Sequence, residues 1–289
     1  KLNPIFDNIN RQSKYKITKF SFGNKNKNKK FYVIKRTPGG GFFSNLLYVI
    51  VNLKLAEKKN FIPVVDMCNF PTNYNQKKNM NNEKNIWNLF FQPVSRYNLN
   101  EVYKSRNVYF SPNKTKFRLE KYKNKELKKI FDKYKKINKK ILSIVESFVK
   151  KNFKNKKILG IHFRGTDQKI AANHAHPPTI FEVESLIKKK VVDGKFDKIF
   201  LLTEDLKYYK KLKKKYKNLI YSYNYFRANS IEEFSNSKRK NHRNNLGFEN
   251  LVEVITLSKC SEIIYCETNI SMFAIFYSNF KISKHHIDN

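Results

Sequence analysis

The stretch KILGIHFRGTD, residues 157–167, decides the fold class of this chain. Its apolar residues Ile158, Leu159, Ile161 and Phe163 are followed abruptly by polar ones. This pattern predicts a buried strand whose carboxyl end delivers polar groups to a crevice. In open α/β sheets, ligands bind just outside the carboxyl ends of the strands. The alternative is a surface loop with an ordinary solvated arginine and aspartate.

Two polar side chains of this stretch are expected to share one face of the strand. Side chains alternate along a strand, so His162 should lie opposite Ile161 and Phe163, and Arg164 should lie on the same side as His162. The planar fork of a guanidinium suits a phosphate group. Arg164 is therefore a candidate for binding a phosphate beyond the end of the strand.

Apolar runs and helical periodicities alternate along most of the chain. Strands are expected over residues 31–34, 61–66, 157–163, 198–203, 219–222 and 262–266, and helices over 46–60, 119–152, 179–191, 206–216, 249–259 and from about 269. Thr179 and Glu182 have the spacing of a helix capping box. Residues 1–30 show no strong pattern, and 227–246 are expected to form a basic loop. The alternation predicts an α/β protein with parallel, doubly wound sheets.

A glycine-rich turn lies between the first expected strand and the helix that follows it. It contains Gly39, Gly40 and Gly41, followed by Phe42 and Asn45. Glycines accept positive φ and let a ligand approach the backbone closely, and helix N–H groups then face that ligand. The turn is neither a dinucleotide fingerprint nor a phosphate loop with its lysine and hydroxyl residue.

The net charge of +37 raises the question of nucleic-acid binding. Only nine of the 60 basic residues are arginine, although specific phosphate and base contacts favour arginine. The lysines are also spread along the whole chain. We therefore interpret them mainly as a solvated surface, with contact to anionic membrane surfaces as a by-product.

The remaining composition places further bounds on the protein. With 40% hydrophobic residues the chain can build a core, and no run approaches the ~20 apolar residues of a membrane span. The cysteines Cys68, Cys260 and Cys266 are few and unpatterned, and the last two lie in apolar surroundings that predict buried thiols. This usage is typical of a reducing compartment and predicts a cytoplasmic protein. Trp87 lies on a helical stripe and is expected in the core.

Several separated patches together resemble one family. His162-Phe163-Arg164-Gly165-Thr166-Asp167 is similar to the His-x-Arg-Arg/Gly-x-Asp signature of the GDP-fucose-dependent fucosyltransferases, a group that includes α1,6, α1,2 and protein O-linked types. His176-Pro177 matches a His-Pro pair of the α1,6 type. The glycine-rich turn, the strand end at 201–205, and the helix, strand and turn over 251–271 resemble further parts of the family.

The resemblance implies a GT-B glycosyltransferase built from two Rossmann-like halves. Residues 1–150 would form the acceptor side with the glycine-rich turn, and 151–289 the donor-binding half. Fucose, or a related deoxyhexose, would move from a GDP-sugar to a glycan hydroxyl with inversion, without a metal ion or another cofactor. The sequence itself contains no Asp-x-Asp motif and no convincing metal cluster.

The resemblance also assigns roles to individual residues. Arg164 would bind the β-phosphate, because a leaving GDP without a metal needs fixed donors. Glu253 would accept hydrogen bonds from the guanine edge, and Asp205 would support the pocket. The expected donor-binding residues are Gly40, Gly41, Phe42, Asn45, His162, Arg164, Asp205, Glu253, Thr268, Asn269 and Ser271.

The general base is left open by the sequence. The α1,6 enzymes carry a glutamate ten residues after the signature histidine, and Ala172 occupies that position here. Asp167, His174 and Asp66 are the candidates for the base, because a histidine or a carboxylate with a raised pKa suits that task. The expected catalytic residues are thus Arg164, His162, Asp167 and His174.

Two other functions remain possible from the sequence. The first is a basic protein that grips nucleic acid or an acidic polymer through its lysines, which predicts strong salt dependence without nucleotide specificity. The second is a relative that binds a sugar nucleotide without turnover, which the alanine at position 172 would explain. The leading hypothesis is the transferase, whose partners are a GDP-sugar and a glycan acceptor and not a specific nucleic acid.

Overall fold

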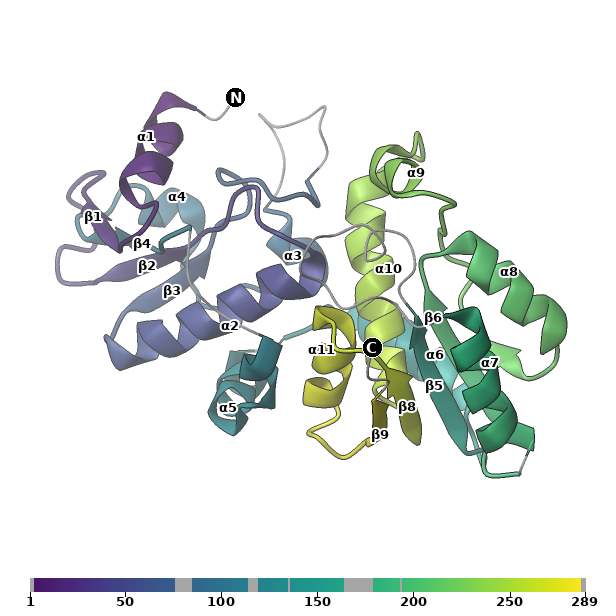
Figure 1. The fold of residues 1–289 in the computed structure, drawn as a ribbon. Coiled ribbons are helices and arrows are strands. Elements are labelled where there is room, and N and C mark those ends of the chain that lie inside the picture. Colours follow the sequence, from purple (N-terminus) through teal and green to yellow (C-terminus); the bar gives the residue numbers. More distant parts are fainter. Residues whose placement is uncertain are drawn as a thin grey trace. The chain divides into compact units, whose positions relative to one another are not determined.

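The chain divides into two compact units. The computed structural model describes residues 3–75, 85–113, 119–134, 136–163, 179–192 and 194–286. Unit 1 comprises Lys1–Lys139 and Arg243–Phe248, and unit 2 comprises Lys140–His242 and Glu249–Asn289. The first change of unit therefore comes slightly before the expected boundary at 150. Each unit is built around its own sheet (Figure 1). The acceptor and donor roles expected of the two halves stay predictions.

Unit 1 contains a four-stranded sheet in the order β1-β4-β2-β3. Its elements are α1 (Pro4–Gln12), β1 (Thr18–Phe20), β2 (Phe31–Ile34), α2 (Phe42–Lys58), β3 (Ile62–Val65), α3 (Trp87–Phe90), α4 (Leu99–Val102), β4 (Val108–Phe110), the 3-10 turn η1 (Leu119–Lys123) and α5 (Lys125–Tyr134). β2 pairs in parallel with β3 and β4, and β1 is antiparallel to β4. Pro63 fits β3 because that strand lies at the edge, where a missing N–H is tolerated.

The N-terminal thirty residues carry more structure than their pattern indicated. α1 begins where the Asn3 side chain accepts a hydrogen bond from the Ile5 N–H, with Pro4 at its first position. Ile9 is buried in a core that also contains Phe31 and Phe110 from the sheet. Because only one residue of α1 is buried, its apolar stripe is too weak to be recognised in the sequence. The helix is stabilised by tertiary packing.

The helix α2 is the main apolar element of unit 1, and most of its residues are buried. It contacts β2, β3 and α5, which explains why its apolar residues extend around it. Trp87 is buried as expected and stacks on Phe91 with ring centroids 4.3 Å apart. Within the described ranges no helix, α2 included, is both long and apolar enough to cross a membrane.

The prediction of a single long helix over residues 119–152 is wrong. The structure has η1, α5 and α6 (Lys139–Asn152) there, with an extended interruption around Ile137. Ile137 is buried and forms an antiparallel bridge with Phe91, while the Gln92 N–H donates to the Lys136 carbonyl at 2.7 Å. The apolar spacing continues across the break, so periodicity alone could not reveal that this backbone pairs with another segment.

Unit 1 also buries a lysine that has no carboxylate partner among the described residues. Lys35 directly follows β2, and its Nζ donates to Asn10 Oδ1 at 3.0 Å and Asn113 Oδ1 at 2.7 Å. The ammonium lies 5.1 Å from the ring centroid of Phe70. Burial lowers the pKa of Lys35 to about 7, because the charged form loses its hydration.

The stability of unit 1 should therefore depend on pH through Lys35. Between about pH 7 and 10.5 the unfolded chain holds a proton on this lysine that the folded chain lacks, so stability rises with pH in that window. Lys35→Met removes this dependence and should raise the melting temperature more at pH 6.5 than at pH 9. Thermal unfolding at both values tests this, with the exposed Lys30→Met as the control. An equal shift at both pH values would contradict it.

Unit 2 contains a fully parallel five-stranded sheet in the order β7-β6-β5-β8-β9. Besides α6 its elements are β5 (Ile158–Phe163), α7 (Ile180–Ile187), the π-helical turn η2 (Lys188–Val192), β6 (Lys198–Thr203), α8 (Leu206–Lys215), β7 (Ile220–Tyr221), α9 (Ile231–Asn236), α10 (His242–Leu257), β8 (Glu262–Tyr265), α11 (Asn269–Tyr277) and β9 (Ser283–His286). The expected capping box of Thr179 and Glu182 is present at the start of α7. The parallel, doubly wound arrangement is confirmed in this unit.

The prediction of a loop over residues 227–246 is also wrong in part. α9 forms within it, and α10 begins at His242 rather than near 249. The His242 ring bonds the Phe234 carbonyl at 2.7 Å, and Arg239 pairs with Glu249 through both of its terminal nitrogens at 2.6 and 3.0 Å. These contacts join residues far apart in the segment, so basic composition alone could not predict them.

The strand β5 is buried along its whole length. Leu159, Ile161 and Phe163 belong to a core with residues of α7, α8 and the neighbouring strands. On the other face, Gly160 makes room for α10 and the turn after it. A Cβ there would lie 2.7 Å from Leu257 Cδ1 and 3.1 Å from Cys260 Sγ. Cys260 and Cys266 are both buried free thiols, as expected.

Replacing Gly160 should test this close packing. Gly160→Val is expected to destabilise the protein by about 1–3 kcal/mol, because the new methyl groups overpack the space held by Leu257. Urea unfolding measures the change. In Gly160→Val/Leu257→Ala the loss should be smaller than the sum of the two single losses, since the alanine leaves the room that the valine needs. Strictly additive losses would contradict the proposed contact.

Candidate functional site

The sheet of unit 2 has a topological switch point beside β5. From β5 the chain adds β6 and β7 on one side and later returns to add β8 and β9 on the other. In parallel sheets, ligands bind outside the carboxyl ends of the two strands between which the strand order reverses, here β5 and β8. The polar residues expected at the site follow these two strands. The geometry thus favours ligand binding here.

His162 and Thr268 meet at this switch point. His162 is buried, and its Nδ1 lies 3.5 Å from Thr268 Oγ1. As expected, His162 is not part of the core that contains Ile161 and Phe163. The structure thus brings together two predicted residues that are far apart in the sequence.

The start of α11 contributes the other predicted residues at this switch point. Thr268 and Ser271 form a capping box, and Ser271 Oγ also donates to the Cys266 carbonyl at 2.7 Å. These two hydroxyls therefore shape the turn. Asn269 Oδ1 is buried without a hydrogen-bond partner among the described residues. A bound ligand that donates a hydrogen bond would satisfy this oxygen, and the helix N-terminus favours an anion nearby.

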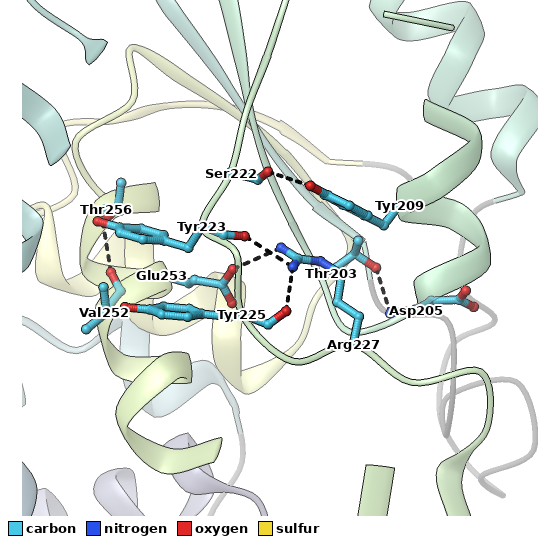
Figure 2. Close-up of polar contacts among 10 residues, drawn as sticks. All are labelled: Thr203, Asp205, Tyr209, Ser222, Tyr223, Tyr225, Arg227, Val252, Glu253 and Thr256. Atoms are coloured by element: carbon cyan, nitrogen blue, oxygen red, sulfur yellow. Dashed lines mark hydrogen bonds and ion pairs between the residues drawn. The ribbon is translucent and has the colours of Figure 1, made fainter. Parts of the chain in front are cut away.

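A second polar cluster of unit 2 surrounds Arg227 and Glu253 (Figure 2). Their side chains are almost fully buried, with Arg227 Nη2 3.3 Å from Glu253 Oε1. Arg227 Nη1 also donates to the carbonyls of Tyr223 and Tyr225 at 3.2 and 2.9 Å, and the guanidinium lies 4.1 Å from the ring centroid of Tyr209. Burial raises the pKa of Glu253 to about 8, against the opposing effect of Arg227.

The aromatic residues of this cluster are packed tightly. The rings of Tyr223 and Tyr225 stack with centroids 4.9 Å apart, and the Tyr223 hydroxyl lies 2.9 Å from Thr256 Oγ1. Sequence reasoning missed Arg227, which it placed in a basic loop. The available signal was the alternation of Tyr223, Tyr225 and Arg227 after a strand, in a chain that otherwise prefers lysine. The guanine-binding role of Glu253 stays a prediction, and one of its oxygens already faces Arg227.

Asp205 has a mainly architectural position. Its Oδ1 accepts the N–H groups of Lys207 and Tyr208 at 2.9 and 3.1 Å and so caps α8. It also forms a parallel bridge with Ala228, the neighbour of Arg227. Asp205 therefore positions the Arg227 segment, and the role expected of it in supporting the donor pocket stays a prediction.

The glycine-rich turn of unit 1 is held by its own residues. Asn45 Oδ1 accepts the Gly40 N–H at 2.9 Å, and Asn45 Nδ2 donates to the Gly40 carbonyl at 3.1 Å. Gly39 has φ +77° and leaves no space for a side chain beside Asn45. The N–H of Phe42 donates to the Tyr74 hydroxyl at 2.8 Å. In this conformation Gly40 and Phe42 use their donors within the unit, whereas a Cβ at Gly41 would point into open space.

Other predicted residues are either outside the described ranges or have a different setting. Arg164, Asp167 and His174 lie outside the described residues, as does Ala172. Asp66 is fully buried and accepts hydrogen bonds from the backbone of Cys68 and Asn69, the Asn69 amide and the Tyr103 hydroxyl. Four donors on one carboxylate indicate a structural turn residue rather than a general base.

No protein-family model and no curated protein matches the sequence. Among solved structures, NodZ α1,6-fucosyltransferase co-crystallised with GDP aligns with a TM-score of 0.60 and 14% identity, over 90% of this chain and 96% of that chain. The fold is that of the GDP-fucose-dependent fucosyltransferases. The fucosyltransferase NodZ from Bradyrhizobium aligns with a TM-score of 0.57 at 14% identity, over 88% and 94%. An Arabidopsis thaliana FUT1 variant in complex with GDP gives 0.50 at 9% identity, over 93% and 73%.

These likenesses confirm the fold class expected from the sequence. The fucosyltransferase fold accounts for two sheet-based units in one chain and for a switch point beside β5. Among the described residues, no group of three His, Cys, Asp or Glu could hold a metal ion.

The buried ion pair should respond sharply to the loss of one partner. At pH 9, above the raised pKa of Glu253, the pair is charged, and Glu253→Ala then leaves the Arg227 charge buried without a carboxylate, which typically costs about 3–5 kcal/mol. Urea unfolding measures this, with the exposed Glu232→Ala as the control. Arg227→Met/Glu253→Leu should recover most of the loss, because no charge is then buried. A loss for Glu253→Ala no larger than that for Glu232→Ala would show that the pair contributes nothing.

Proposed function

We propose that this protein is a glycosyltransferase that moves fucose, or a related deoxyhexose, from a GDP-sugar to a glycan hydroxyl. The observation that carries the proposal is the match to a fucosyltransferase fold with GDP bound, over nearly the full length of both chains. It is supported by His162 and Thr268, which converge at the switch point where such folds place ligands.

The proposed reaction is a single displacement at the anomeric carbon. The acceptor oxygen forms a bond to this carbon from one face, while the bond to the β-phosphate oxygen breaks on the other face, which inverts the configuration. The hydroxyl proton passes to a base, for which Asp167 and His174 are the candidates. Both electrons of the broken bond leave with GDP.

The proposed reaction needs no metal ion if the protein meets the charge of the leaving GDP. Arg164 would donate to the β-phosphate, and the first N–H groups of α11 would add partial positive charge. Asn269, beside these N–H groups, would bond a hydroxyl of the donor. Such fixed donors stabilise developing charge without rearranging at the moment of reaction. Glu253 would select guanine by accepting from two N–H groups of its edge.

Nucleotide binding tests the proposal directly. Calorimetric and thermal-shift titrations with GDP, UDP and ADP at moderate salt should show selective stabilisation by GDP, because a ligand bound only to the folded state raises its melting point. Arg164→Ala should weaken GDP at least tenfold by removing a charge-assisted contact to phosphate. The exposed Arg106→Ala, which removes the same charge, should leave GDP affinity unchanged.

Three results would change the conclusion. Stabilisation by any polyanion in proportion to its charge would replace the transferase with the polyanion-binding alternative. Full GDP affinity in Arg164→Ala would remove the role given to this arginine. Selective GDP binding without transfer or hydrolysis of GDP-fucose would identify a non-catalytic relative, for which the alanine at position 172 would be the reason.

A further inference from the structure

Unit 1 contains a cavity that the proposed donor chemistry does not use. Its volume is about 890 Å³, within the range typical of small-molecule sites. It lies beside Val64 and Val65 of the edge strand β3. The other lining residues come from the segment that runs through α3 to the start of α4 and from the end of α5 and the residues after it: Asn85, Trp87, Asn88, Gln92, Pro93, Val94, Ser95, Arg96, Tyr97, Asn98, Leu99, Asn100, Lys133, Tyr134 and Lys136.

The lining combines aromatic rings with side-chain amides. Tyr97 and Tyr134 are both partly exposed, and Asn88, Gln92 and Asn98 present amides to solvent. Rings pack against the C–H faces of pyranoses, while amides donate to and accept from their hydroxyls. The ring of Tyr97 is held edge-to-face on Phe31 with centroids 5.0 Å apart, so its orientation is fixed before a ligand binds. The cavity is thus suited to a sugar.

The cavity is also positively charged. Its charged lining residues are Arg96, Lys133 and Lys136, and none of the described lining residues is a carboxylate. Two carboxylates, Glu57 and Glu101, lie near the lining. Glu57 pairs with Lys133, and Glu101 pairs with Lys25 and acts on Arg96 only at longer range, so within the described part of the chain Arg96 and Lys136 form no ion pair. Arg96 Nη2 donates to the Tyr97 hydroxyl at 3.1 Å, and Lys29 lies 4.8 Å from the Tyr97 ring centroid. Donors from Lys29 and Arg96 lower the pKa of Tyr97.

One polar atom of the lining lacks a partner. Ser95 Oγ is shielded from solvent and makes no hydrogen bond within the described part of the chain. Shielded polar atoms normally have a partner, so an unpaired hydroxyl beside a cavity indicates a group that a ligand supplies. The Trp87 indole N–H, by contrast, is already bonded to the Gln92 carbonyl at 3.1 Å. Ser95 therefore marks a position for a sugar hydroxyl next to Arg96.

We propose that this cavity binds an acidic sugar unit of the acceptor glycan. The carboxylate or phosphate of the sugar would meet Arg96 and Lys136, its ring would pack against Tyr97, and a hydroxyl would bond Ser95. That the bound sugar belongs to an acceptor rests on the proposed function. The binding of an acidic sugar in this cavity does not depend on that function. All lining residues of the cavity belong to unit 1, and none of them is among the residues expected to bind the donor.

Binding measurements on the full chain test the proposal. The probes are a glucuronic-acid tetrasaccharide, a mannose-6-phosphate-terminated oligosaccharide and the neutral chitotetraose, titrated at moderate salt. At least one acidic probe should bind about tenfold or more tightly than chitotetraose, because a charge-assisted contact adds to the stacking and hydrogen bonds. The two acidic probes distinguish a carboxylate from a phosphate as the recognised group.

A charge-matched pair of variants separates the cavity from the general lysine surface. Arg96→Ala/Lys136→Ala should weaken the acidic probe about tenfold or more, whereas Lys210→Ala/Lys214→Ala, which removes two exposed charges from α8, should leave it unchanged. Tyr97→Ala should weaken acidic and neutral probes alike, because it removes the stacking surface that both kinds of sugar use.

The same variants show whether the acidic-sugar site or the proposed donor site is at fault if binding is not observed. GDP affinity, measured on the same variants, should not change. If GDP does not bind the unmodified protein but the acidic probe does, the proposed function fails and the acidic-sugar site stands. Equal losses in the two double variants, or binding of inorganic polyphosphate as tight as that of the sugars, would overturn the acidic-sugar site.

Discussion

The burial of β5 on both faces is the constraint on which unit 2 depends. A central parallel strand must be covered by helices on each side, so nearly all of its side chains have to be apolar or very small. Leu159, Ile161 and Phe163 satisfy this on one face, and Gly160 satisfies it on the other by letting Leu257 approach closely. His162 is the exception. It is tolerated because it lies near the carboxyl end, where Thr268 supplies a polar neighbour.

The chain uses its two kinds of basic residue differently. Three arginines each donate hydrogen bonds to two or more oxygens through a planar guanidinium. Arg36 does so at the glycine-rich turn, Arg227 in the cluster with Glu253, and Arg239 against Glu249. Arginine suits these positions because its fork reaches several acceptors at once and is weakly hydrated. Many lysines are exposed instead. The net charge of +37 is therefore mostly a property of the solvated surface rather than a description of any one site.

Lys35 is buried, unlike the many exposed lysines, and the composition of the chain cannot reveal this. Its ammonium lies in a buried position among asparagine amides and the ring of Phe70. One lysine among many in the sequence thus acquires a pKa of about 7, while the exposed Lys30 nearby is an ordinary surface residue. The difference comes from the surroundings of the side chain, which are assembled from α1, the end of β2 and the segments after β3 and β4.

The sequence by itself determined the alternation of strands and helices, the parallel sheet of unit 2, the capping box before α7 and the buried state of Trp87, Cys260 and Cys266. These features depend on periodicity and neighbouring residues, which one chain segment carries within itself. The same local signals carried the resemblance to the fucosyltransferases, because its motifs are short and follow strand ends.

Tertiary structure decided the rest. The helix expected over 119–152 is interrupted because Ile137 pairs with Phe91. The helix α9 forms where a loop was expected, and Arg227 contacts Glu253. Tertiary structure also formed the cavity beside β3 from three separate segments. Each of these features joins residues distant in the sequence, and the free energy that selects them comes from burial and pairing that exist only once the chain has folded.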